Sequence, residues 1–169
     1  WKDTYINYYS RKFVRLMTGP EVVDAISKAT DQPGQYSFSG TTVSRMKEMA
    51  TPGGGREITG LMQAFFQSNP NTQVPDGNRP STLQALLMTN SRFINEKIAA
   101  QNGSRVQQVL ESGKNNEQIV EELFLSSLGR WPTLEEKIVA FQALEKDRKQ
   151  GAENIQWALL NSIEFVLNH

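Results

Sequence analysis

Apolar side chains recur every three or four positions along most of the chain, which is the spacing of amphipathic α-helices. The pattern is broadest in the last stretch, Gly151 to His169. On a helical wheel its apolar positions cover more than half of the circumference, which is wider than a surface helix needs. These apolar positions are Ile155, Ala158, Leu159, Leu160, Ile163, Phe165, Val166 and Leu167. We therefore predict one continuous, central helix here, with the other helices packed around it.

Start and stop signals divide the rest of the chain into further helices. The predicted helices cover residues 5–17, 20–30, 57–67, 81–98, 104–112, 115–128 and 133–151, which with the last stretch makes about eight. Asn115 with Gln118, and Thr133 with Glu136, are expected to form capping boxes. Asn90 falls within the apolar face of its helix. We expect it to end or kink that helix, with Ser91 capping the next turn, although a polar group in a pocket is an alternative.

Two stretches rich in Gly, Pro, Ser, Asn and Thr are predicted to be long irregular loops, at residues 31–56 and 68–80. The first has room for one short strand near Tyr36 to Val43, and the domain as a whole is expected to hold at most a minor strand pair. Its glycines at 53–55 precede a helix, but they lack the lysine and hydroxyl of a phosphate-binding loop, so a connector is expected. The predicted class is all-α, a single compact domain over 1–169, expected to be the C-terminal piece of a longer multidomain chain.

Composition narrows the possible chemistry. The 169 residues carry 18 basic and 18 acidic side chains, so no net charge attracts nucleic acid. The chain has no cysteine, which excludes thiolate zinc sites, iron–sulfur clusters and covalent haem attachment within it. No apolar run approaches the length of a membrane span, so membrane insertion is not expected. We predict no metal and no cofactor in this domain.

The polar residues offer no recognisable catalytic set. Glu121 and Glu122, like Glu135 and Glu136, are neighbours on a helix, where side chains point about 100° apart and do not converge on one substrate atom. The only histidine, His169, lies at the end of the sequence, where it makes a poor general base.

One group of polar side chains is a candidate binding groove, between the 68–80 loop and the last helix. It consists of Arg79, Asn90, Trp157, Asn161 and Glu164. A tryptophan there is suited to stack on a sugar, or else to pack in the core.

The junction before residue 134 is predicted to be structural. Pro132 prevents the preceding helix from continuing, and Thr133 and Glu136 start the next one. Arg130 is expected to bond terminal carbonyls and to pair with a carboxylate such as Glu136 or Glu164.

Three motifs resemble a known family. They are Leu128 to Glu136 with its Arg-x-Pro-Thr-x-x-Glu core, Gln84-Ala-Leu through Asn90, and Trp157-Ala-Leu-Leu-Asn-Ser-x-Glu-Phe with the terminal Asn168-His169. From Tyr8 to His169 the chain resembles the C-terminal domain of unknown function in large cytochrome-associated surface proteins of planctomycetes and related soil bacteria. The resemblance implies an extracytoplasmic, mostly helical end piece whose partners are neighbouring domains of the same chain. It implies no assigned reaction.

The chain departs from that family at one place. Many members carry a Cys-Glu-Cys-Glu-Arg stretch where this chain has Val74 to Arg79, and only the arginine matches. No thiolate-based metal or redox role is possible here. Two function classes remain: a non-catalytic interaction or architectural module, which we favour, and a polysaccharide-binding or glycan-hydrolase accessory domain. The candidate partners are accordingly the neighbouring domains, an extracellular protein or a glycan.

Overall fold

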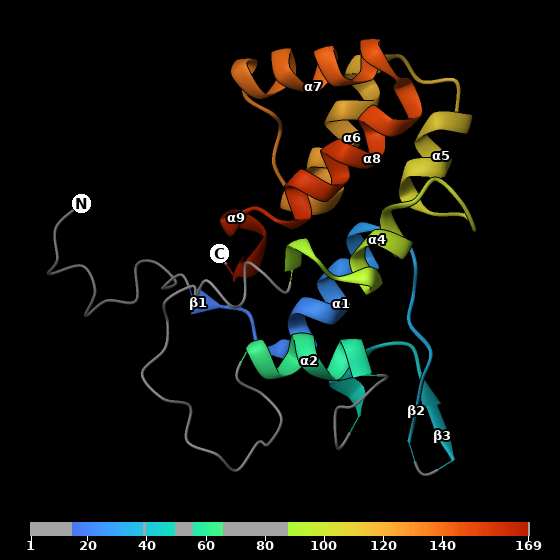
Figure 1. Cartoon of the computed structure of the whole chain (residues 1–169), viewed down its shortest axis with the longest axis vertical. Helices are drawn as coiled ribbons and strands as arrows, with labels where there is room; N and C mark the ends of the chain where they lie inside the picture. The colour runs from blue at the N-terminus through green and yellow to red at the C-terminus, as the bar shows by residue number, and fades with distance from the viewer. Residues whose placement is uncertain (1–14, 39, 50–55, 66–87, 169) are drawn as a thin grey trace, which may run out of the picture.

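The computed structural model describes residues 15–38, 40–49, 56–65 and 88–168 (Figure 1). Within these residues the fold is all-α, as predicted, with eight α-helices, one 3₁₀ helix and two small antiparallel strand pairs. The helices are α1 (Gly19–Ala29), η2 (Met46–Glu48), α2 (Arg56–Ala64), α4 (Arg92–Ile98), α5 (Arg105–Glu111), α6 (Asn116–Leu128), α7 (Leu134–Lys146), α8 (Arg148–Leu160) and α9 (Ile163–Val166). The strands are β1 (Arg15–Leu16), β2 (Tyr36–Phe38), β3 (Thr41–Val43) and β4 (Leu167–Asn168).

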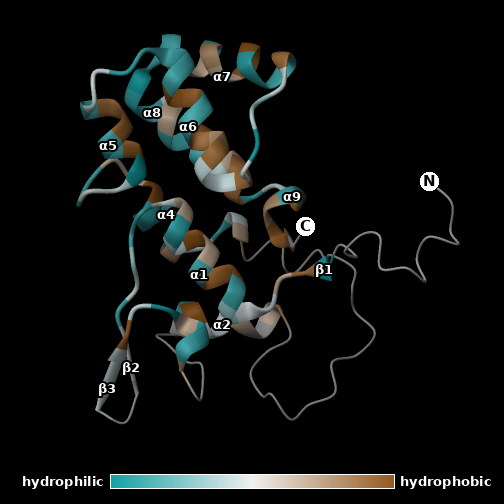
Figure 2. Ribbon diagram, turned by 180° about the vertical axis from the view of Figure 1, so that it is seen from behind, coloured by the Kyte–Doolittle hydropathy of each residue, from teal (hydrophilic) through white to brown (hydrophobic). Residues whose placement is uncertain are grey.

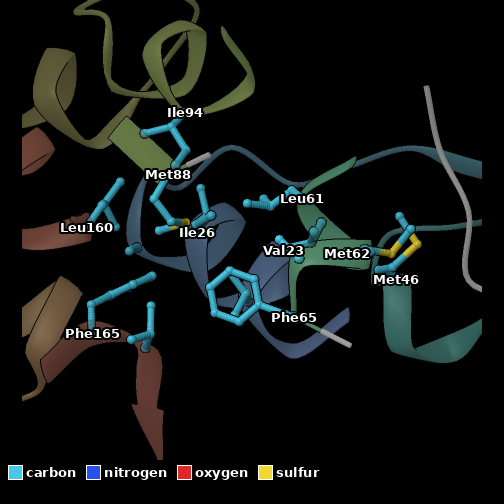
Figure 3. Packing of buried hydrophobic residues seen from close by; sticks show 14 of the residues in the cluster. Val23, Ile26, Met46, Leu61, Met62, Phe65, Met88, Ile94, Leu160 and Phe165 are labelled. Carbon is cyan, nitrogen blue, oxygen red and sulfur yellow. The ribbon is translucent and has the colours of Figure 1, made fainter. Parts of the chain in front are cut away.

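The helices surround two hydrophobic cores. The first core joins α1, α2, η2 and α4 to the end of α8 and to α9, and Figure 3 shows Ile26, Leu61 and Phe165 converging within it. The second core lies among α5, α6, α7 and α8, which occupy the other end of the molecule in Figure 1. Figure 2 shows hydrophobic and hydrophilic segments alternating along the helices, as expected for amphipathic helices. Helix α8 contributes to both cores, so the prediction of a central role for this stretch is confirmed.

A fully buried glutamine lies where the two cores meet. The Gln156 side chain is 0% exposed, and its Nε2 donates to Ser127 Oγ of α6 at 2.9 Å and to the Ala29 carbonyl of α1 at 3.4 Å. Its Oε1 has no hydrogen-bond partner within the described part of the chain. Because a buried amide is costly unless it is bonded, these contacts favour one relative placement of α1, α6 and α8.

The last stretch is two helices rather than one, which corrects the sequence prediction. Helix α8 ends at Leu160 and α9 begins at Ile163. The Ser162 hydroxyl donates to the Leu159 carbonyl at 2.7 Å and accepts from the Phe165 N–H at 3.2 Å. One side chain thus satisfies the end of one helix and the start of the next, and side-chain bonds of this kind compete with continued helix.

The preceding helix also ends earlier than predicted. Helix α7 stops at Lys146, because Asp147 is extended (φ −157°, ψ 111°) and its carboxylate accepts from the Gln150 N–H at 2.9 Å, capping α8. The corner between the two helices is tight. A Cβ added at Gly151 would lie 2.4 Å from the Ala143 carbonyl oxygen, so only glycine fits there.

A further correction concerns residues 15–17, which were predicted to end a helix. Arg15 and Leu16 form β1, which pairs antiparallel with β4 through Arg15–Asn168 and Leu16–Leu167. The rest of that predicted helix, residues 5–14, lies outside the described residues. The same holds for the 68–80 loop and for the 81–87 part of the helix predicted at 81–98.

Several local predictions are confirmed. Asn115 with Gln118 and Thr133 with Glu136 form capping boxes. Ser91 caps α4, and Asn90 occupies an exposed turn just before it. The described part of the 31–56 stretch has no α-helix before Arg56. It holds the β2–β3 hairpin, and the 3₁₀ helix follows.

Candidate functional site

The five residues of the predicted groove have different environments. Arg79 lies outside the described residues, and Asn90 is exposed. Trp157 is half-buried and packs against the first core. The Asn161 Nδ2 donates to the Trp157 carbonyl at 2.8 Å and helps to end α8. Glu164, on α9, contacts Arg130 instead, at the edge of a different depression.

Arg130 is the centre of an ion-pair cluster. Its Nη2 and Nη1 lie 2.7 and 2.9 Å from the two carboxylate oxygens of Glu136. Its Nε and Nη2 lie 2.6 and 2.8 Å from those of Glu164. The guanidinium also stands 5.5 Å from the centre of the Phe124 ring. Both carboxylates proposed from the sequence therefore pair with Arg130, and the pairing joins α7 to α9.

The cluster holds Arg130 and Glu136 in their charged forms. Hydrogen bonds from Arg130, opposed by partial burial and supported by bonds from Thr133, lower the pKa of the Glu136 carboxyl to about 2. The two carboxylates raise the pKa of the Arg130 guanidinium above its usual value. A group so firmly ionised is a poor proton donor or acceptor near neutral pH, so the cluster is better suited to structure and recognition than to acid–base catalysis.

Beside the cluster runs an apolar groove of about 540 Å³ between α7 and the paired helices α6 and α8. In Figure 1, α7 lies across the ends of α6 and α8, and the segment from α6 to α7 runs beside these helices. The apolar lining comprises Phe124, Leu128, Val139, Ala140, Ala143, Ile155, Ala158 and Leu159. Three of these residues are alanines, at 140, 143 and 158, and at those positions a second backbone can approach closely.

Charge is concentrated at one end of this groove. Among the residues that the structure describes, Glu135, Glu136 and Glu164 line it together with a single cation, Arg130. Three carboxylates against one guanidinium leave an excess of negative charge next to an apolar surface. A ligand that places a basic group there gains an ion pair in addition to apolar contact.

The apolar spacing did not indicate this groove, because the helices before the last stretch were predicted to pack their apolar faces around that stretch. In the structure Ala140 and Leu144 are buried, whereas Ile138 is 51% and Val139 67% exposed. One signal was available: apolar residues on α7 occupy more than one face, which is more than a helix with one buried side requires.

Two other kinds of site are not found within residues 15–38, 40–49, 56–65 and 88–168. No set of three or more His, Asp or Glu side chains there is arranged to hold a metal ion. In the same residues, no helix combines the length and the apolar character needed to cross a membrane.

Comparison of the chain with protein-family models, curated proteins and solved structures gives no match. The groove and the polar surfaces around it are therefore interpreted from their own geometry.

Proposed function

We propose that this chain is a non-catalytic interaction module, and that it holds its partner in the apolar groove beside α7. The observation that carries the proposal is the groove itself, which has an apolar lining and is bounded at one end by the Arg130 cluster. Exposed apolar surface arranged in this way is typical of a protein–protein contact. The half-buried Trp157 does not line it, which favours this function over the glycan-binding alternative for the groove.

The partner that fits best is an amphipathic helix with a basic residue near one end. Its apolar face would cover Val139 and Ala158, both exposed at the groove. Its basic side chain would meet the excess carboxylate charge near Glu135. In line with the family resemblance, we place that helix in a neighbouring domain of a secreted, cytochrome-associated multidomain chain.

A designed helical peptide tests this function. It is cross-linked to stay helical, with leucine and alanine on one face and arginine at one end, and its binding to the whole chain is followed by fluorescence anisotropy. Val139→Asp should weaken binding at least about tenfold, because the new charge would be buried under the peptide.

Ile138→Asp is the matched control. Residue 138 is also an exposed β-branched residue on α7, but it does not line the groove, so peptide affinity should stay near the unmodified value. Changing the peptide arginine to glutamate should weaken binding to the unmodified protein. If both substitutions weaken binding equally, or if the peptide does not bind at all, the groove is not the docking site.

A further inference from the structure

A second surface, away from the groove, has a different chemistry. Trp131 lies in the segment between α6 and α7 and is 61% exposed, although tryptophan is usually much more buried. Its backbone is held on both sides. The Trp131 carbonyl accepts from Arg130 Nη1 at 3.1 Å, and Pro132 is buried. An exposed indole on a fixed backbone is a platform that binds without a large loss of conformational freedom.

The indole borders a polar depression of about 450 Å³, within the roughly 300–1,000 Å³ range of small-ligand sites. Helix α6 supplies Gln118, Glu121, Glu122 and Leu125 to it. These residues follow the spacing of three and four that places side chains on one helix face. Leu125 is 39% exposed and extends the apolar surface next to the indole.

The polar groups of the depression are positioned by neighbours but retain bonding capacity. Glu121 accepts from Lys137 at 2.9 Å, and Glu122 accepts from Arg105 at 3.5 Å and from Lys114. An ionised carboxylate has about four acceptor sites, so each can also accept hydrogen bonds from a ligand. The Gln118 carbonyl oxygen accepts from the backbone at the start of α6, which leaves its amide hydrogens as donors.

The charges on this surface balance locally. Three cations, Arg105, Lys114 and Lys137, contact the two carboxylates of the depression, and Lys137 also pairs with Glu117. The three positive charges therefore meet three negative ones, so neither an anion nor a cation is preferred. Hydroxyl groups suit such a lining because each can both donate and accept. The flat apolar indole requires an apolar face on the same ligand.

We infer that this depression binds a neutral saccharide, with one sugar ring stacked on Trp131 and its hydroxyls hydrogen-bonded to Gln118, Glu121 and Glu122. A pyranose ring has the required combination: C–H groups on one face and hydroxyls around its edge. This site goes beyond the proposed docking function and shares no residue with the groove.

Isothermal titration calorimetry of the whole chain tests the inference, with cellohexaose, xylohexaose, mannohexaose and chitohexaose as probes. At least one probe should bind. Trp131→Ala should weaken that binding about tenfold or more, whereas Trp131→Phe should retain part of it, because phenylalanine keeps an aromatic face. Gln118→Asn should weaken it less, since it shortens the amide without removing it.

Leu134→Ala is the matched control, since Leu134 is an exposed apolar residue close by in sequence that does not line the depression. Its sugar affinity should be unchanged. No binding of any of the four probes at about 10 mM would overturn the inference. Equal affinity of Trp131→Ala and the unmodified chain would also overturn it. Because Val139→Asp leaves this surface intact, that variant should bind sugar normally, which separates this result from failure of the groove.

Discussion

Helices α1 and α7 begin with the same arrangement: an arginine, a threonine three residues later and a glutamate three residues after that. The residues are Arg15, Thr18 and Glu21 for α1, and Arg130, Thr133 and Glu136 for α7. Each arginine binds both oxygens of its glutamate, at 2.8 and 3.1 Å for α1 and 2.7 and 2.9 Å for α7. Each threonine N–H donates to the same glutamate, and each arginine also donates to the next carbonyl.

The two helix starts differ in whether the arginine also binds a carboxylate far away in the sequence. Arg130 also binds Glu164, which is 34 positions further along the chain, through its Nε and Nη2. Within the described part of the chain, the Arg15 side chain bonds only to Leu16 beside it and to Glu21 in the first turn of α1. The same local pattern therefore only caps a helix at the start of α1, whereas at the start of α7 it also links α7 to α9. A helix-start motif sets local geometry, and a distant carboxylate decides how much of the fold depends on it.

Loss of the two arginines should separate these roles most clearly. Arg130→Ala should lower the free energy of unfolding by about 1–3 kcal/mol, because Glu136 and Glu164 then face each other without a cation. Arg15→Ala should cost about 1 kcal/mol or less, as the loss of a single, partly exposed pair does. Urea denaturation followed by circular dichroism measures both. Arg92→Ala, which removes an exposed pair within α4, is the control and should have almost no effect. Equal costs for Arg15 and Arg130 would show that the link to α9 contributes nothing.

Acidification should weaken both helix starts. The arginine bonds lower the pKa of Glu21 and of Glu136 from 4.5 to about 2. A carboxyl whose pKa is lower in the folded state stabilises the fold above its unfolded pKa, and that contribution is lost as pH falls from about 4.5 to about 2. Each should contribute about 1–2 kcal/mol after allowance for solvent screening.

Thermal melting between pH 6 and pH 2 measures this loss. The double variant Glu21→Gln, Glu136→Gln should be less stable at neutral pH and should lose less stability on acidification. A pH profile unchanged by the two substitutions would assign the acid sensitivity to other carboxyls.

Removal of the threonines should affect the two helices alike. The Thr18 hydroxyl donates to the Glu21 carboxylate at 2.9 Å, and the Thr133 hydroxyl accepts from the Glu136 N–H at 3.3 Å. Thr18→Ala and Thr133→Ala should each cost about 1 kcal/mol, because each removes one hydroxyl bond at a helix start and neither threonine touches Glu164. The same denaturation measurement applies. A difference between them much greater than about 1 kcal/mol would indicate that the α7 cap also depends on α9.

A double-mutant cycle measures the link to α9 on its own. Arg130→Ala, Glu164→Gln and their combination should give a coupling free energy of about 0.5–1.5 kcal/mol. In the Glu164→Gln background, Arg130→Ala should cost about as much as Arg15→Ala does in the unmodified chain. A coupling free energy of zero between Arg130 and Glu164 would show that the arrangement at the start of α7 acts only as a local helix cap.

Several features that depend on contacts between residues close in sequence could be predicted, whereas most features that depend on distant residues could not. The caps at Asn115 and Thr133 are confirmed because their partners lie three residues away and their signals are local. The break at Ser162 was missed because the apolar spacing continues through it, and a serine within a helical pattern is compatible with either outcome. Only the contact of its hydroxyl with Leu159 decides between them.

Contacts between residues far apart in the sequence were harder to predict. The burial of Gln156 depends on α1 and α6 meeting around α8, which no local pattern specifies. The groove arises because α7 turns across α6 and α8 at the Gly151 corner, leaving Val139 uncovered. The pairing of Arg130 with Glu164 was among the expected alternatives, since a buried or half-buried guanidinium requires carboxylates. That it binds both carboxylates at once is a result of the tertiary fold.

The pairing of β1 with β4 has a mechanical consequence. The ladder joins Arg15 to Asn168 and Leu16 to Leu167, and the Met17 N–H donates to the Val166 carbonyl at 2.9 Å. Because the strands are antiparallel, a pulling force applied at residues 15 and 168 acts on the same end of the ladder. Its bonds are then loaded one after another, so this pair yields at low force while the side chains of α1 and α9 are still packed in the first core.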